Sequence, residues 1–565
     1  MPFIRFQSGL SAALLGATAL GLVSCQGGET RGGSTGADGG TVIVAAPAEA
    51  ETLLPPLVTS IAAKQIVDQL FDFLADIGPN LNTVGDAGFT PRLADSWKWS
   101  ADSSAVTFHI NPKARWHDGK PVTGADVAFS YDLTADPVLE SFVRTNLPAI
   151  DSVRVPDSSS VTFYYKKKAP ERFFQLVYNL WILPKHLLES LDRKQLASSA
   201  FARNPVGSGP FKFVRWEPRG AIELVANTDY PLGRPHLDRV VFAYSSDLGT
   251  AANRVAAGEA DMVELVRPET QDVLVKSGKV RIMRYGGWDG FYFAFNLRNP
   301  KNRAAPHPIL SQLGVRQAIA LSLDRPAAVK NVFDTLATMI EGPFVHSHFT
   351  ADSSLHQLPH DSVRAMAILD SLGWKDTNGD GIRDKGGQPL RLEVIAPSTS
   401  LARRRLAVIL QEQCKKVGID VAIRELEPAA VQKATDGGAF DIVVNGWHFD
   451  PSPASVSQAW GSFDLNTNSN IGRYKNPHAD SLMQRVVEEP NPAKVRQMYS
   501  EIYHTIVSDV PAVFLYELTG NAGINTRIQV PSLRSDAWWA TLSQWSIPPA
   551  QRIDRDKVGL PAKSN

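Results

Sequence analysis

"RLEVIAPSTSLARRRLAVILQEQCKKVGIDVAIREL", residues 391–426, joins two apolar segments through a longer amphipathic one. Residues 390–396 and 419–426 are typical of strands, and residues 400–418 predict a helix that ends at Gly418. A strand, a helix and a strand at this spacing predict a right-handed βαβ unit within a parallel sheet. The stretch therefore indicates an α/β fold.

A further strand is predicted after a second short helix, in "AFDIVVNGWHFDPSP", residues 439–453. In open α/β sheets, ligands bind in the crevice beyond the carboxyl ends of the strands. The residues that leave this strand are Trp447, His448 and Asp450. We therefore expect these three side chains to face a ligand crevice.

A second region, residues 96–131, also carries clear local signals. "AVTFHI", residues 105–110, is typical of a short strand because of its β-branched and aromatic content. Thr123 can cap a helix whose first turn carries Asp126. This region adds a strand and a helix to the predicted α/β chain.

Composition limits the function classes. About 525 residues follow Gly40, which is too long for one core and predicts several domains. The 58 Lys and Arg residues balance the 58 Asp and Glu residues, so no net field attracts nucleic acid. No apolar run after the first 25 residues approaches the length of a membrane-spanning helix.

The amino-terminal segment has the layout of a secretory signal: Arg5 precedes an apolar run over residues 9–23. The run ends in Leu-Val-Ser-Cys, residues 22–25, which resembles the lipobox of bacterial lipoproteins. That resemblance implies removal of residues 1–24 and a lipid on Cys25, with the Gly- and Ser-rich residues 26–40 as a flexible tether. An ordinary signal peptide with an incidental cysteine is the alternative.

The second cysteine, Cys414, has no partner for a disulfide. It shares one predicted helical face with Leu406, Leu410 and Val417. We expect a buried and inert thiol.

Several common catalytic motifs are absent from the sequence, including H-E-x-x-H, the phosphate-binding G-x-x-x-x-G-K-[ST] and C-x-x-C. This weakens an enzymatic role without excluding one, because paired catalytic carboxylates leave no local signature.

Two segments suggest metal sites. "DTNGDGIRD", residues 376–384, resembles a calcium loop, but position 12 is Gly387 instead of a bidentate Glu, so a solvated turn is favoured over a weak calcium site. Residues 346–360 contain four histidines that could bind zinc, nickel or copper. This segment lacks regular periodicity and is interpreted as a polar surface loop.

Seven segments, in this order along the chain, resemble the family 5 extracellular solute-binding proteins, which are oligopeptide, dipeptide and nickel receptors of ABC importers. They are "PRLADSWKWSADSSAVTFHI", "ARWHDGKPVTGADVAFSYD", "NPVGSGPFKF", "YFAFNLRNP", "GVRQAIALSLDR", "LGWKDTNGDGIRD" and "FDIVVNGWHFDPSP". The resemblance implies a periplasmic-binding-protein-like fold of type II, with two α/β lobes, a hinge, an extra domain and a ligand enclosed in the interlobe cleft. Its implied parts are lobe I (41–88, 205–285 and 516–550), the extra domain (89–204) and lobe II (286–515).

The resemblance also implies a binding site. In peptide-binding members, the Asp that follows a Gly-Trp pair contacts the ligand's α-ammonium, and backbone groups around that pair bind the peptide main chain. Here the motif falls on Gly446, Trp447, His448 and Asp450. Asp450 could instead cap the turn that begins at "DPSPAS", and Trp447 could be a core residue. Phe449 and Pro451 depart from well-matched peptide receptors, which leaves the orientation of the loop open.

The implied function is that of a substrate-binding lipoprotein of an ABC importer, which captures oligopeptides and delivers them to a membrane permease. We expect a monomer in the cell envelope, held at the membrane by the lipid on Cys25, with no catalytic residues, cofactor, bound metal or nucleic-acid partner. The alternatives are a receptor of the same fold for an oligosaccharide or a metal chelate, and an envelope hydrolase.

Overall fold

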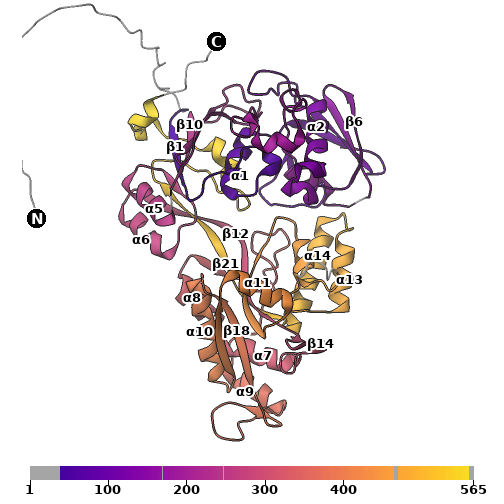
Figure 1. The fold of residues 1–565 in the computed structure, drawn as a ribbon, viewed down its shortest axis with the longest axis vertical. Helices are drawn as coiled ribbons and strands as arrows, with labels where there is room; N and C mark the ends of the chain where they lie inside the picture. The colour runs from indigo at the N-terminus through magenta and orange to yellow at the C-terminus, as the bar shows by residue number, and fades with distance from the viewer. Residues whose placement is uncertain (1–37, 168, 246, 464–468, 559–565) are drawn as a thin grey trace, which may run out of the picture.

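The computed structural model describes residues 38–558, except 168, 246 and 464–468 (Figure 1). The predicted signal peptide and Cys25 lie outside the described residues. Two parts are visible, one above the other, and strands β12 and β21 pass between them. The two-lobe α/β fold is thus present.

One mixed sheet of 11 strands runs through both parts of the described chain. Its order is β19 (Asp420–Leu426), β18 (Arg391–Pro397), β20 (Ile442–His448), β12 (Val280–Phe295), β21 (Ala512–Asn525), β11 (Met262–Val263), β1 (Thr41–Ala46), β10 (Arg239–Tyr244), β9 (Ala221–Ala226) and β8 (Phe211–Glu217), with β15 (Ala337–Met339) paired to β21.

The βαβ prediction is confirmed. Strands β18 and β19 pair in parallel, and α10 (Leu401–Lys415) connects them. The Ser400 side chain caps this helix by accepting the N–H of Arg403. Strand β20 adds in parallel to β18 but runs antiparallel to β12, so the complete sheet is mixed.

Fourteen described α-helices surround the sheets. They are α1 (Ile61–Leu70), α2 (Gly124–Ala135), α3 (Arg172–Asn179), α4 (Lys185–Leu188), α5 (Leu248–Ala257), α6 (Pro268–Lys276), α7 (Leu313–Ser322), α8 (Arg325–Phe333), α9 (Ser362–Ser371), α10, α11 (Pro428–Gly437), α12 (Ser455–Trp460), α13 (Pro477–Val486) and α14 (Pro492–Asp509). Within the described chain, none of these helices is long and apolar enough to cross a membrane.

A separate four-stranded sheet lies in the upper part, in the order β4 (Ala94–Trp99), β5 (Ala105–Ile110), β7 (Ser160–Tyr165) and β6 (Ile150–Asp157) (Figure 1). The predicted strand over residues 105–110 is confirmed as β5. Thr123 and Asp126 form a capping box at the start of α2, as expected. Small hairpins complete the strands: β2 (Ala75–Ile77) with β3 (Phe89–Pro91), β13 (Arg298–Asn299) with β14 (Asn302–Pro306), and β16 (Asp384–Lys385) with β17 (Gln388–Pro389).

The two strands that join the parts, β12 and β21, are paired along most of their length but lose register between Tyr285 and Asp289. Gly286 and Gly287 lie in this irregular segment. A Cβ atom on Gly287 would overlap the carbonyl oxygen of Leu518, so a side chain cannot be accommodated there without a shift of the backbone. The irregularity is the natural position for a hinge.

We propose the predicted boundaries for the parts of the fold and use these names below. The first lobe comprises residues 41–88, 205–285 and 516–550, the extra domain residues 89–204, and the second lobe residues 286–515. One continuous apolar cluster contains Phe173 and Phe174 of the extra domain together with Phe449 and Tyr499 of the second lobe. The parts are therefore in contact.

The two ends of the described chain meet in a buried ionic network. Arg527 donates to Asp261 over 2.9 Å, to Asp556 over 2.6 Å and to the carbonyl of Thr41 over 3.0 Å. Asp556 in turn accepts the N–H of Thr41, the first residue of β1. The first lobe thus includes residues close to both termini.

Cys414 is fully buried on α10. Its Sγ lies 3.5 Å from the hydroxyl of Ser322, and burial raises the pKa of the thiol to about 12. The prediction of a buried thiol is confirmed, and the raised pKa makes it unreactive at neutral pH.

Candidate functional site

The predicted site residues lie at the end of β20 and in the loop that follows. Gly446, Trp447 and His448 pair with Phe291, Gly290 and Asp289 of β12. A Cβ atom on Gly446 would lie 2.6 Å from the Phe291 ring, which explains why glycine occupies this position. The antiparallel neighbour therefore fixes the path of the Gly-Trp pair.

Trp447 is partly buried and packs against the apolar cluster that joins the parts of the molecule. Its indole Nε1 is enclosed and has no hydrogen-bond partner among the described residues. The Trp447 side chain thus packs as a core residue does, while its indole N–H has no acceptor among the described residues.

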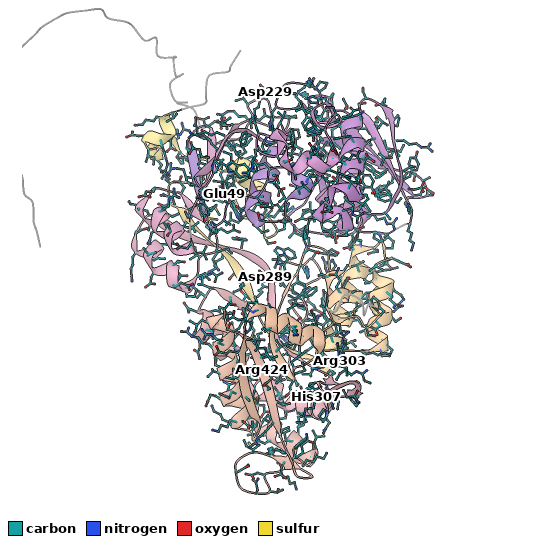
Figure 2. The ribbon with its side chains drawn as sticks, viewed as in Figure 1. Glu49, Asp229, Asp289, Arg303, His307 and Arg424 are labelled. Carbon is teal, nitrogen blue, oxygen red and sulfur yellow. The ribbon has the colours of Figure 1, made fainter. Side chains whose placement is uncertain are left out.

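His448 is directed toward the neighbouring strand. Its Nδ1 lies 2.9 Å from a carboxylate oxygen of Asp289, and this hydrogen bond raises the pKa of the imidazole. Figure 2 shows Asp289 at the level where the two parts of the molecule meet. His448 and Asp289 place a charged pair there whenever the imidazole is protonated.

Asp450 ends the motif. Its Oδ1 accepts the backbone N–H of Ser452 over 2.8 Å, while its second oxygen has no hydrogen bond to a described residue. The residue is reached by solvent but is surrounded by protein, and this desolvation raises the pKa of the carboxyl against the opposing effects of Ser452 and His448. Both predicted roles are compatible with this geometry, because one oxygen stabilises the turn and the other is available.

Three contacts hold the Asp450 loop (residues 449–452) on the second-lobe side. The Phe449 N–H donates to the Trp288 carbonyl over 2.7 Å, and Phe449 is buried against the edge of the His348 ring. His348 Nε2 lies 2.8 Å from the carbonyl of Asp450. Phe449 and His348 therefore anchor this loop together.

The interpretation of residues 346–360 as a polar surface loop is wrong for His348. This side chain is 3% exposed and packs between Trp288 and Phe449. Burial disfavours the charged imidazole and lowers its pKa to about 4. His348 is a structural residue beneath the Asp450 loop, and no periodicity in the sequence could have shown this.

A contact that sequence analysis missed reaches the Asp450 loop from the extra domain. The Ser452 hydroxyl donates to Glu171 Oε2 over 2.6 Å, and the second oxygen of Glu171 is hydrogen-bonded to the hydroxyl of Thr83 in the first lobe. No local signal predicts this contact, because Glu171 and Ser452 are 281 residues apart.

Comparison with known proteins identifies the family. A model of the bacterial extracellular solute-binding proteins, family 5, matches residues 88–469. The chain belongs to this family. It is 29% identical over 484 residues to the oligopeptide-binding protein AppA of Bacillus subtilis, covering 85% of this chain and 86% of the relative.

Two solved structures support the family 5 fold. AppA from Bacillus subtilis in complex with a nonapeptide has 26% identity and a TM-score of 0.67, covering 90% of this chain and 99% of that one. NikZ from Campylobacter jejuni in complex with Ni(L-His) has 25% identity and a TM-score of 0.68 with the same coverage. Relatives of this fold thus include one solved with a peptide and one solved with a metal complex.

This family 5 protein also has a cavity of about 400 Å³ in the first lobe and extra domain. Its charged lining residues include Arg92 and Arg534, which pair with Asp72 and Asp76. Residues 446–450 do not line it. The cavity is therefore distinct from the candidate site.

The predicted metal segments have ordinary explanations in the described structure. Asp376 accepts the N–H groups of Gly379 and Gly381, as in the favoured solvated turn. His346 is paired with Glu517 over 3.2 Å. Over residues 38–558, leaving out the undescribed positions, no group of three or more His, Cys, Asp or Glu side chains could hold a metal ion.

Proposed function

We propose that this family 5 protein captures oligopeptides between its lobes and delivers them to the permease of an ABC importer. The observation that carries the proposal is the Asp450 carboxylate, which lies at the carboxyl end of β20 with one oxygen available for a ligand. A peptide's α-ammonium is the complementary group. The relative AppA, whose structure was solved with a nonapeptide, supports the same ligand class.

The proposed binding mode assigns a role to each predicted residue. Asp450 pairs with the ligand ammonium, the backbone around Gly446 and Trp447 pairs with the peptide main chain, and Trp447 and His448 border the ligand. Main-chain pairing gives affinity without reading side chains. This mode therefore produces a receptor that tolerates many peptide sequences, without catalytic residues or a cofactor.

The proposed location is the outer face of a bacterial membrane, where the monomeric protein is held by a lipid on Cys25. Two or more acyl chains anchor a protein stably, whereas one does not. We expect Cys25→Ser to lose incorporation of labelled palmitate and to move the protein from the membrane to the soluble fraction. The control Cys414→Ser should keep both properties, because Cys414 is buried. Equal behaviour of the two variants would contradict the anchor.

The ligand proposal is tested by purifying the full chain in mild detergent, denaturing it and identifying the released molecules by mass spectrometry. A ladder of mixed short peptides would support the proposal. A single oligosaccharide or metal complex would replace the ligand class and leave the family unchanged. If no molecule is released, titration with a random peptide library follows, and the absence of any binding heat would overturn the peptide proposal.

The hydrolase alternative needs its own control, because Glu171 and Asp450 are two carboxylates bound to one serine. Peptide incubated with an equimolar amount of protein should be recovered intact. Cleaved peptide that disappears in the Asp450→Asn variant would favour a hydrolase.

A further inference from the structure

Glu171 forms hydrogen bonds that link all three parts of the molecule. It belongs to the extra domain, binds Thr83 of the first lobe through one carboxylate oxygen, and binds Ser452 of the second lobe through the other. Outside strands β12 and β21, the bond to Ser452 is the one hydrogen bond or ion pair between described residues that joins the second lobe to the rest. Any rotation that separates the lobes must break it.

Glu171 lies at the start of helix α3, but its carboxylate does not bind the N–H groups of that helix. Glu171 is the N-cap residue of α3, where a side-chain oxygen commonly accepts an N–H of the first turn. It makes no such cap bond and instead extends to Ser452 and Thr83. Glu171 thus lacks the local cap bond to its own helix and makes a hydrogen bond to Ser452 across the lobe boundary instead.

Glu171 is partly buried, and it has no cationic partner among the residues that the structure describes. Desolvation raises the pKa of its carboxyl, and the nearby Asp450 raises it further, while two hydroxyl groups act in the opposite direction. A buried acid without a countercharge lowers stability, and such groups concentrate at functional sites. Its position between the lobes suggests what that function is.

Ser452 links Glu171 to the proposed ligand carboxylate. Its hydroxyl donates to Glu171, and its backbone N–H donates to Asp450 Oδ1. A displacement of Ser452 therefore moves the turn that orients Asp450. His348 and Trp288 hold the same loop from within the second lobe, so Glu171 is the contact that depends on lobe closure.

We propose that Glu171 is a positioning residue that latches the extra domain onto the Asp450 loop when the lobes close. The inference rests on the proposed function, since it requires a ligand that is captured by closure. Glu171 contacts no ligand in this scheme. It stabilises the closed state and fixes Ser452, so it strengthens the binding of every ligand by the same factor.

Affinity is measured by calorimetry on the full chain in mild detergent, with two peptides that differ in their side chains. Glu171→Ala is expected to weaken both by about tenfold, because the hydrogen bond to Ser452, which only the closed state makes, is lost. Glu171→Gln should recover most of the loss, since its amide can serve both hydroxyls. The matched control is Glu189→Gln, an exposed acid of the same domain, which should change nothing.

A double-mutant cycle separates the latch from a merely structural role. If Glu171 acts through Ser452, the Glu171→Ala/Ser452→Ala double variant loses no more affinity than Glu171→Ala. Additive losses, or a preference for one peptide over the other, would overturn the inference. If Glu171→Ala does not fold, the test uses Glu171→Gln and Ser452→Ala. Each variant must then weaken the binding of both peptides by the same factor.

Lobe closure is measured without a ligand by energy transfer between dyes on Lys113→Cys and Lys475→Cys, two exposed positions on opposite sides of the boundary. Cys414 is buried and should not be labelled. Glu171→Ala is expected to shift the distribution toward the open state. An unchanged distribution would overturn the latch even if peptides bind, whereas a wild-type protein that binds no peptide would overturn the proposed function instead.

Discussion

Asp450 has an environment that opposes its charge before any ligand arrives. Its carboxyl has a raised pKa because surrounding protein replaces water, and its neighbours include a second acid, Glu171. A carboxylate in this situation gains more from an incoming ammonium than an ordinary surface acid does. Its cost to the free protein and its benefit to the complex have the same physical origin.

We therefore expect Asp450→Asn to have opposite effects on binding and stability. Peptide affinity should fall about a hundredfold, because the ligand ammonium loses its charged partner. The melting temperature of the ligand-free protein at pH 7 should rise slightly, because the charge that the surrounding protein disfavours is gone while Asn can still accept the Ser452 N–H. Calorimetry and thermal unfolding measure the two quantities, and Asp272→Asn on exposed α6 should change neither. A loss of both affinity and stability would mean that the charge is structural.

The same carboxyl predicts the direction of pH dependence. A bound ammonium favours the ionised form, so binding below the raised pKa of Asp450 requires release of a proton. Peptide affinity should be constant at neutral pH and fall on acidification, starting above the usual range of an aspartate. Dissociation constants measured from pH 7 to pH 4 test this, and the slope should vanish in Asp450→Asn. A slope that instead vanishes in His448→Gln or Glu171→Gln would assign the titration to one of those neighbours.

At the level of elements, the candidate site depends on how tightly β20 lies against β12. Gly446 faces the Phe291 ring, whose nearest atom would be 2.6 Å from an added Cβ. Central strands cannot move apart easily because β12 is also paired with β21. The Gly-Trp motif therefore has a packing function in addition to its proposed contact with a ligand.

Gly446→Ala is expected to lower the free energy of unfolding by about 1–3 kcal/mol, the usual cost of an added group in a packed core. Urea denaturation measures the change. Gly437→Ala in α11 is the matched control, because no atom lies within 4 Å of the added methyl group, and it should leave stability unchanged or slightly increased. Equal stabilities of the two variants would show that β20 can shift away from Phe291.

Elements with local signals were predictable from the sequence, and contacts between distant segments were not. The strand–helix–strand pattern in residues 391–426 and the Thr123–Asp126 cap depend on residues that are close together in the chain, and both predictions are confirmed. The pairing of β12 with β21 spans the whole second lobe, so no nearby residues specify it. His348 is buried by Trp288 and Phe449, which come from other segments. Trp447, His448 and Asp450 were expected in a crevice from their place after a predicted strand, whereas their roles came from a family resemblance and stay predictions.

At the scale of the whole molecule, Arg527 joins the C-terminal segment to β1 and β11. We expect Arg527→Met to lower the free energy of unfolding by about 3–5 kcal/mol, because Asp556 would remain buried without its cation. Chemical denaturation measures this loss. Lys557→Met removes an exposed pair with Asp554 and should cost less than about 1 kcal/mol. A small effect of both changes would mean that water replaces the lost guanidinium.

The order of strands in the main sheet also determines when this chain can fold. β21 lies between β12 and β11, and Asp556 and Arg527 hold the start of β1, so the first lobe needs residues from both ends of the polypeptide. A ribosome must therefore synthesise the chain through β21 and Asp556 before the amino-terminal lobe can be completed. Until then the emerging protein has no complete first lobe. A product truncated before β21 would lack the strand between β12 and β11, so its main sheet would stay divided.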